Sequence, residues 1–247
     1  MENRQGLVLF GLLLSAGIVI GAWILGADIK DSRLSDRYVT VKGLVERSVK
    51  SDLAIWRLNY REAGDDLAGV YSKTDTDGQT VLEFLTQEGI QSSEIDRGVV
   101  RVTDTQANEY GGNNRAPHRY IVDQQITVRT SNVDRVAAAA QKTITLLKKG
   151  IVLTGGQGLV YKFTGLNAIK PDMITEATRN ARAAADRFAS DSGSKVGSIR
   201  QATQGVFTIL AADQGSDPSE GGYAGQGDTS LMKTVRVVTT VEYYLEK

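Results

Sequence analysis

The chain has 247 residues, of which 29 are basic and 29 acidic, and it contains no cysteine. Its balanced charge is unlike that of a nucleic-acid-binding protein, which needs clustered lysine and arginine beside stacking aromatic residues. The lack of cysteine excludes disulfides, thiolate metal sites and thiol catalysis.

The first predicted element is an uncharged segment from Leu7 to Leu25. As a helix, its nineteen residues would reach roughly 28 Å, about the thickness of the hydrocarbon core of a bilayer. The alternative is a cleaved signal peptide, but the apolar run is longer than the usual signal core, and Leu25 stands where a cut after Ala27 requires a small residue. We therefore predict an uncleaved single-pass signal-anchor. Its lipid-facing residues include Leu7, Phe10, Leu14, Val19, Trp23 and Leu25.

Gly17 and Gly21 lie one helical turn apart on the same face of this segment. Such a face lets two helix backbones approach closely, which makes the pair a candidate helix–helix contact. The alternative is that the pair has no role in association, because glycine is common in membrane-spanning helices.

The first half of the body predicts two strands, a helix and a further strand. Apolar and polar residues alternate over 38–45 and 54–60, which favours two strands joined as an antiparallel hairpin. From Asp65 to Gly89 the apolar spacing lengthens to that of a helix, whose positive end suits the acids at its start. A strand over 95–105 follows.

The second half predicts alternating strands and helices after an aperiodic loop over 106–117. The apolar stripe from Val133 to Leu147 predicts one helix, with Ser131 or Asn132 as its cap and Gly150 at its end. The other elements are strands over 119–130 and 158–164, a helix with Pro171 in its first turn and Gly193 at its end, a strand over 196–207, a polar loop over 212–230 and a strand over 232–245.

The helix that follows Pro171 has an unusually small inner face. Alanine supplies most of the residues that recur at steps of three and four, so we expect this helix to approach its partner closely. The predicted inner face consists of Ile174, Ala177, Ala181, Ala184 and Phe188.

None of the sequence motifs that resemble functional sites has the residues that its chemistry needs. His118 is the only histidine, so no second imidazole or thiolate can join it in a metal site. The segment 75–78 is similar to a calcium loop, but Lys73 and Phe84 occupy positions that require acids, so an interruption of the helix is the better interpretation. The glycine-rich segments 155–158 and 221–227 fit a turn and a connection. We therefore predict no catalytic, metal-binding or cofactor-binding residue and no enzyme.

The order and spacing of several segments resemble the SIMPL-domain family of bacterial envelope proteins. In the alanine-rich helix the likeness is the phrase AxxNARAAADRFAxxxG. The segments that carry the resemblance are Val39 to Gly43 with Ser51 and Asp52, Tyr120 to Asp134, Ala177 to Gly193 with Gly197, and Val235 to Leu245.

The resemblance implies an α+β fold of antiparallel sheets with two to three packed helices, following one transmembrane helix. Together with the residue pattern, the resemblance gives a membrane anchor over 1–27, a linker over 28–37 and a SIMPL-like domain over 38–247, with sub-domains over about 38–110 and 118–247 as an alternative division. It also implies a single-pass inner-membrane protein with its carboxy-terminal domain in the periplasm. The basic residues after the span favour a cytoplasmic body, but long domains translocate largely regardless of flanking charge.

Two classes of function follow. The first is a homo-oligomeric structural or assembly scaffold in contact with membrane lipid, ring-forming and linked by the resemblance to oxidative-stress defence. We expect unpaired edges on the strands over 119–130 and 232–245, and such edges tend to find partners. The alternative is a periplasmic module that binds a small ligand, or an enzyme, with a pocket between two halves.

Overall fold

The computed structural model describes residues 37–107, 117–155, 158–212 and 229–246, together with Ser15, Gly17, Val19 and Gly21. The chain divides into two interleaved compact units. Unit 1 comprises Met1–Val45, Lys170–Phe207 and Val237–Lys247, and unit 2 comprises Glu46–Ile169 and Thr208–Arg236. This division differs from a split near residues 110–118, because strands from either side of that loop pair in one sheet.

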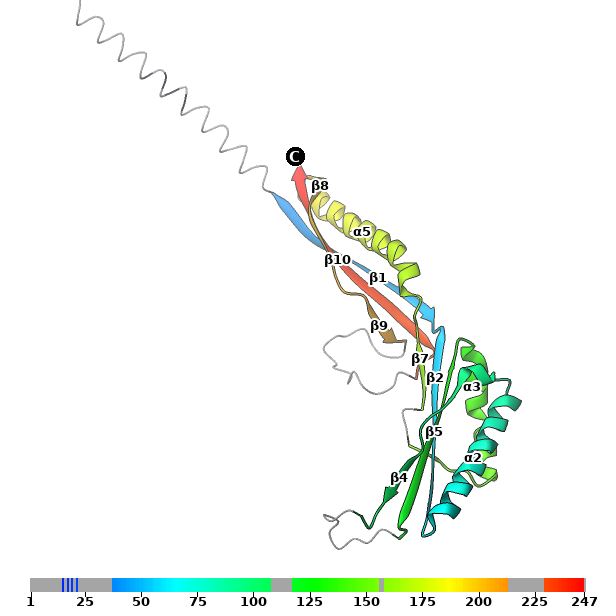
Figure 1. Cartoon of the computed structure of the whole chain (residues 1–247). Coiled ribbons are helices and arrows are strands. Elements are labelled where there is room, and N and C mark those ends of the chain that lie inside the picture. The colour runs from blue at the N-terminus through cyan, green and yellow to red at the C-terminus, as the bar shows by residue number, and fades with distance from the viewer. Residues whose placement is uncertain are drawn as a thin grey trace, which may run out of the picture. The chain divides into compact units, whose positions relative to one another are not determined.

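Unit 1 contains most of a four-stranded sheet with the path β1-β10-β8 (Figure 1). The elements of this sheet and its covering helix are β1 (Tyr38–Lys50), α5 (Leu166–Asp191), β8 (Lys195–Gln204) and β10 (Met232–Glu246). The end of β1 and the starts of α5 and β10 belong to unit 2. β8 is antiparallel to β10. β1 is antiparallel to β10 as well, because the carbonyl of Arg37 before β1 accepts a 2.9 Å hydrogen bond from Leu245 near the end of β10.

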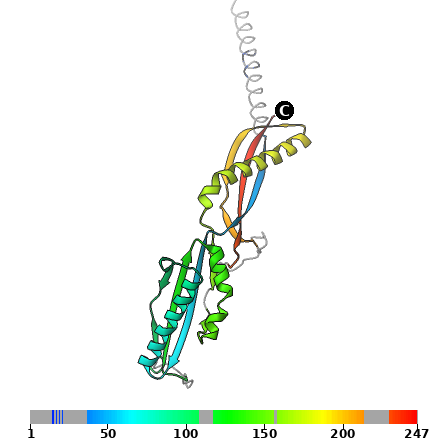
Figure 2. The same ribbon diagram turned by 90° about the vertical axis from the view of Figure 1, so that its right-hand side faces the viewer.

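Helix α5 lies across one face of this sheet in Figure 2. The helix contacts β1 at Gly43, with backbone against backbone. A Cβ atom at residue 43 would overlap the carbonyl oxygen of Ala177 and come within 2.7 Å of the Ala181 nitrogen. Glycine is therefore the residue that this contact requires.

The buried face of α5 is narrower than the sequence predicted. It repeats every four residues and consists of Met173, Ala177, Ala181, Ala185 and Ala189. The expectation of a close approach is confirmed, but the inclusion of Phe188 in the inner face is wrong, because its side chain is 61% exposed. A strict four-residue step drifts around the helix and turns Phe188 away from the sheet.

Unit 2 contains a six-stranded sheet with the path β3-β5-β2-β6, in which β4 also pairs with β5 and β7 also pairs with β2. These strands pair antiparallel to one another. The strands are β2 (Leu53–Gly64), β3 (Ile95–Arg97), β4 (Arg101–Asp104), β5 (Tyr120–Thr130), β6 (Leu153–Thr154) and β7 (Leu159–Lys162). A further short strand, β9 (Thr208–Ala211), pairs with the first residues of β10.

Helices cover one face of the unit 2 sheet (Figure 2). They are α2 (Leu67–Gln87), α3 (Val133–Gln141) and α4 (Ile144–Lys148), with a short 3-10 turn η1 (Ser92–Glu94) before β3. Their apolar faces and the inward residues of β2 and β5 form one core. The core includes Trp56, Leu58, Val81, Leu85, Ile126, Val136 and Leu146.

The α+β class and the antiparallel sheets are confirmed, but the expected hairpin is wrong. β1 pairs with β10, whereas β2 pairs with β5, β6 and β7. At the turn between β1 and β2, the Asp52 carboxylate accepts hydrogen bonds from the backbone nitrogens of Thr164 and Gly165, at 2.7 and 2.9 Å. These bonds hold the start of β2 beside the end of β7, in a different sheet from β1.

The helix expected over 133–147 is divided into α3 and α4. Asn132 caps α3 as predicted, by accepting a 3.2 Å hydrogen bond from the Arg135 nitrogen. Two turn residues after α3 then change the helical phase, and the Thr143 hydroxyl bonds the carbonyl of Ala140 at 2.9 Å. Ile144 is consequently exposed rather than buried. The predicted interruption at Gly78 is also wrong, because α2 continues through it.

The contact at Gly43 predicts a large loss of stability in Gly43→Ala. The added methyl group forces α5 away from β1, so we expect the free energy of unfolding to fall by roughly 3 kcal/mol. Urea denaturation followed by circular dichroism measures this change. Gly155→Ala is the matched control, because a Cβ atom there meets nothing within 4 Å. Equal effects of the two substitutions would contradict the close contact.

Candidate functional site

The predicted anchor lies almost entirely outside the described residues. Leu7, Phe10, Leu14, Trp23 and Leu25 are not among them. Gly17, Val19 and Gly21 are helical, and a Cβ atom at either glycine would meet nothing within 4 Å. No helix in the described parts of the chain is long and apolar enough to cross a membrane.

The sheet edges differ from those that the sequence predicted. β5 and β10 were expected to carry unpaired edges, but both are central strands: β5 lies between β2 and the short strands β3 and β4, and β10 lies between β1 and β8. The expectation was wrong because strand length and alternation do not reveal how many partners a strand has.

β8 forms one edge of the unit 1 sheet. Among the described residues it pairs only with β10. The nitrogen of Gly205, just after β8, donates to the Val238 carbonyl of β10 at 2.8 Å. Backbone groups alternate in direction along an antiparallel strand, so Thr203 also faces β10, whereas the amides of Ala202 and Gln204 point away from it.

β1 forms the opposite edge. The Arg37 carbonyl faces β10, so even-numbered residues of β1 direct their backbone groups outward. The outward Leu44 carbonyl accepts a 3.0 Å hydrogen bond from the Asn180 side chain of α5. Thr40 and Lys42 precede this capped position, so the outward amides and carbonyls of β1 before Leu44 have no partner strand in the described structure.

Arg182 of α5 performs a similar role at the start of β8. Its guanidinium donates to the carbonyls of Val196 and Gly197 at 2.8 and 2.9 Å, and it lies 5.1 Å from the ring centroid of Tyr243. Irregular pairing with β10 between Glu242 and Leu245 coincides with this capped end. Helix α5 therefore blocks parts of both edges and leaves residues 201–204 of β8 accessible.

A polar chain crosses the face of the unit 1 sheet that α5 does not cover. The Arg200 guanidinium of β8 lies 4.1 Å from the ring centroid of Tyr38 in β1 and 3.2 Å from a carboxylate oxygen of Glu242 in β10. These contacts connect β8 with β1 and β10, and a guanidinium stacked on an aromatic ring stabilises such an arrangement.

A second cluster lies between α2 and the unit 2 sheet. The Tyr60 hydroxyl donates to the Gln124 side-chain oxygen at 2.8 Å, and both residues are buried. Arg97 donates to the same oxygen at 3.4 Å and to Asp75 of α2 at 2.6 Å. Gly78 leaves room for the cluster, because a Cβ atom there would lie 2.6 Å from the Tyr60 hydroxyl oxygen and 2.9 Å from an Arg97 nitrogen.

The neighbouring Lys73 completes this cluster. It lies 2.8 Å from Glu62 and 2.9 Å from Asp77, and the Glu62 carboxylate is the main cause that raises its pKa. Burial raises the pKa of Tyr60 to about 12, although the charge of Arg97 opposes the rise. A phenol with this pKa stays protonated at physiological pH and acts as a hydrogen-bond donor. The cluster therefore holds α2 on the sheet.

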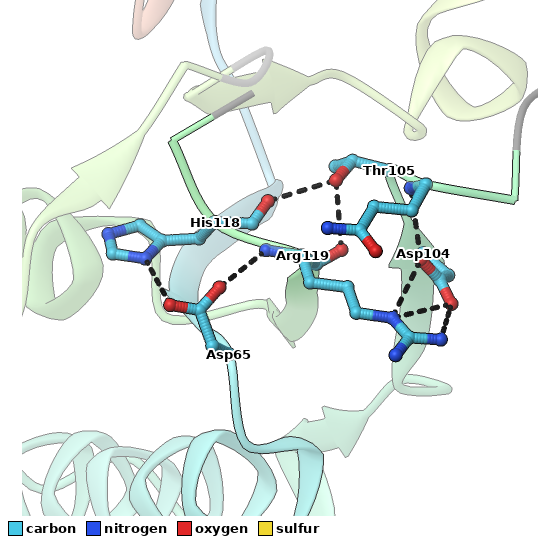
Figure 3. A network of polar contacts seen from close by, with 6 residues as sticks. Asp65, Asp104, Thr105, His118 and Arg119 are labelled. Atoms are coloured by element: carbon cyan, nitrogen blue, oxygen red, sulfur yellow. Dashed lines mark hydrogen bonds and ion pairs between the residues drawn. The ribbon is translucent and has the colours of Figure 1, made fainter. Parts of the chain in front are cut away.

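The lone histidine belongs to an exposed network at the base of the loop that follows β4 (Figure 3). Asp65 accepts a 3.0 Å hydrogen bond from the Arg119 nitrogen and lies 3.7 Å from Nδ1 of His118. The Arg119 guanidinium bonds Asp104 at 3.1 Å and lowers the pKa of that carboxyl. The Thr105 hydroxyl donates to the carbonyl of His118 at 2.9 Å. The network fixes both ends of the loop.

Sequence reasoning did not identify either the edge groups or the Tyr60 cluster. Alternation placed Tyr60 in a predicted strand, but a buried glutamine such as Gln124 has the same sequence signal as an exposed one. Within the described ranges, no group of three or more histidine, aspartate or glutamate side chains could hold a metal ion.

Most of the described chain matches a known protein family. The model of the SIMPL family, described as "Protein of unknown function (DUF541)", matches residues 39–243. The chain belongs to the SIMPL family. No curated protein matches it. In this SIMPL protein, two of the segments that carry the resemblance, Val39 to Gly43 and Ala177 to Gly193, are in contact. Gly43 packs against Ala177 and Ala181.

The Tyr60 cluster predicts that Gly78 and Tyr60 are energetically coupled. Alanine at a helix-interior glycine is ordinarily favourable by about 1 kcal/mol. In this SIMPL protein we expect Gly78→Ala to destabilise by roughly 1 to 3 kcal/mol, because the methyl group meets the Tyr60 hydroxyl. In a Tyr60→Phe background the same change should become nearly neutral or stabilising.

A double-mutant cycle of urea unfolding measures this coupling, which neighbouring residues show and distant ones do not. Gly155→Ala in both backgrounds is the control, and its effect should not depend on residue 60. Additive effects of Gly78→Ala and Tyr60→Phe would contradict the cluster as described.

Proposed function

We propose that this SIMPL protein is a membrane-anchored scaffold of the bacterial envelope that assembles with copies of itself through the edges of the unit 1 sheet. The observation that carries the proposal is the accessible backbone edge of β8 at residues 201–204. Amides and carbonyls that point out of an edge strand favour pairing with another chain.

The two sheets differ in how their edges are protected. In unit 2, the partners on either side of β2 and β5 are strands of two to four residues, and short edge strands discourage pairing between molecules. In the sheet of unit 1, β8 has ten residues and β1 has thirteen, of which residues 38–45 lie in unit 1. The β8 edge from Gln201 to Gln204 also carries neither proline nor charge, the usual devices that prevent such pairing. This contrast supports unit 1 as the assembling unit.

The proposed amino-terminal anchor strengthens weak edge contacts. The uncharged segment from Leu7 to Leu25 has the length and composition of a membrane span, and we place the body on the periplasmic side of the inner membrane. Tethering in one membrane raises the effective concentration of each edge for its neighbour. A few backbone hydrogen bonds per contact then suffice for association.

The proposal predicts that the full-length protein extracted in mild detergent is larger than a monomer. Ala202→Pro with Gln204→Pro should reduce the particle mass, because proline removes the two outward amides. Light scattering coupled to size-exclusion chromatography measures the mass. A wild-type protein that is monomeric at all extractable concentrations would contradict the scaffold function.

Two further variants serve as controls for this experiment. Thr203→Pro removes an amide that bonds β10 within the same molecule, so it should lower the melting temperature more than the outward substitutions do. Gly17→Leu with Gly21→Leu leaves the body unchanged. A smaller particle in that variant shows that the spans also touch, and an unchanged one confines the contacts to the body.

A further inference from the structure

We infer that β8 of one copy pairs in parallel with β1 of the next copy, so that the unit 1 sheets join edge to edge. This inference rests on the proposed function and names the two surfaces that meet. It follows from strand direction, from the positions of the capped carbonyls and from the alternation of outward backbone groups.

β1 and β8 are both antiparallel to β10, so they run parallel to each other at opposite edges of one sheet. Copies anchored in one membrane through the segment before β1 share one orientation. An edge contact between neighbours that are related by rotation about the membrane normal therefore brings β8 against β1 in a parallel sense.

Pairing of β8 with β8 of a second copy is the competing arrangement. A two-fold axis between identical edges makes those strands antiparallel. The β1 strands of the two copies would then begin at opposite ends of the joint sheet, and their anchors would emerge in opposite directions. Membrane tethering disfavours this arrangement and favours the heterologous one, which continues from copy to copy and closes into a ring when the rotation permits.

The accessible parts of the two edges also lie at the same level. Thr203 lies opposite Thr240 of β10. The hydrogen bond between Arg37 and Leu245 sets the register of β1 on β10, and a regular antiparallel ladder from that bond places Lys42 opposite Thr240. Lys42 and Thr203 therefore flank Thr240 from the two sides of β10. The carbonyls that α5 blocks, at Leu44 and at Val196 and Gly197, lie outside this shared level.

The outward groups alternate as a parallel ladder requires. With the two sheets at the same level, Ala202 lies beside Val41 of the next copy. The outward amide of Ala202 can then donate to the carbonyl of Thr40, and its carbonyl can accept from the amide of Lys42. This is the slanted hydrogen-bond pattern of parallel strands. The same register keeps α5 on one face of the joined sheets.

Cysteine crosslinking tests the pairing directly, because the native chain has no cysteine. Thr203→Cys is combined with Thr40→Cys, Lys42→Cys or Leu44→Cys in the full chain in membranes. The three β1 positions point to the same face of the sheet, so they also cover pairings that are shifted by two residues between copies. Within one copy, positions 42 and 203 lie on either side of β10, roughly 10 Å apart, which is too far for a disulfide. After mild oxidation, non-reducing electrophoresis should show a ladder of multimers from one double variant.

The single variants distinguish the arrangements. Thr203→Cys alone and Lys42→Cys alone should give no crosslinked dimers, whereas a mixture of one of the β1 single variants with Thr203→Cys should give dimers and nothing larger. Dimers from Thr203→Cys alone would overturn the inference in favour of paired β8 strands. Particles of high mass without crosslinks in any variant would overturn it while leaving the scaffold function intact. Monomers throughout would overturn both.

Discussion

The contact between α5 and β1 at Gly43 is the constraint on which unit 1 depends. A helix can approach a strand this closely only where both surfaces lack side-chain bulk, and here glycine meets a stripe of alanines. The contact fixes α5 over one face of the unit 1 sheet. From that position, Asn180 and Arg182 reach carbonyls at both edges. One helix thus covers the sheet and sets which edge groups remain accessible.

The two units differ in how they bury apolar side chains and in how they protect the edges of their sheets. Unit 2 buries large side chains beneath α2, α3 and α4, closes its sheet with short strands and uses buried polar groups such as Tyr60 and Gln124 to position α2. Unit 1 has a small core, in which alanine replaces the larger residues. A single covered face and two long edge strands suit an element whose stability increases when further strands join it. This difference underlies the assignment of assembly to unit 1.

The sequence predicted local structure better than partners. The alternation of apolar and polar residues located most strands, and the Asn132 cap was predicted. The alanine-rich face of α5 also predicted that this helix packs closely on its partner. Strand pairing was not predictable in the same way, since β1 pairs with a strand nearly 200 positions later, and the hairpin expected from adjacency was wrong. The edge site could not be derived either, because it depends on which strands are central and on where Asn180 and Arg182 point. Neither property is encoded in local periodicity.

Amide hydrogen exchange of the assembled protein tests most directly whether the outward amides of β8 bond a neighbouring copy. Exchange resolved by residue in detergent particles should show Ala202, Thr203 and Gln204 all protected. In the dissociated chain, Thr203 should remain protected by β10 while Ala202 and Gln204 exchange rapidly. Rapid exchange at Ala202 and Gln204 in intact assemblies, with the alternating pattern unchanged, would contradict the claim.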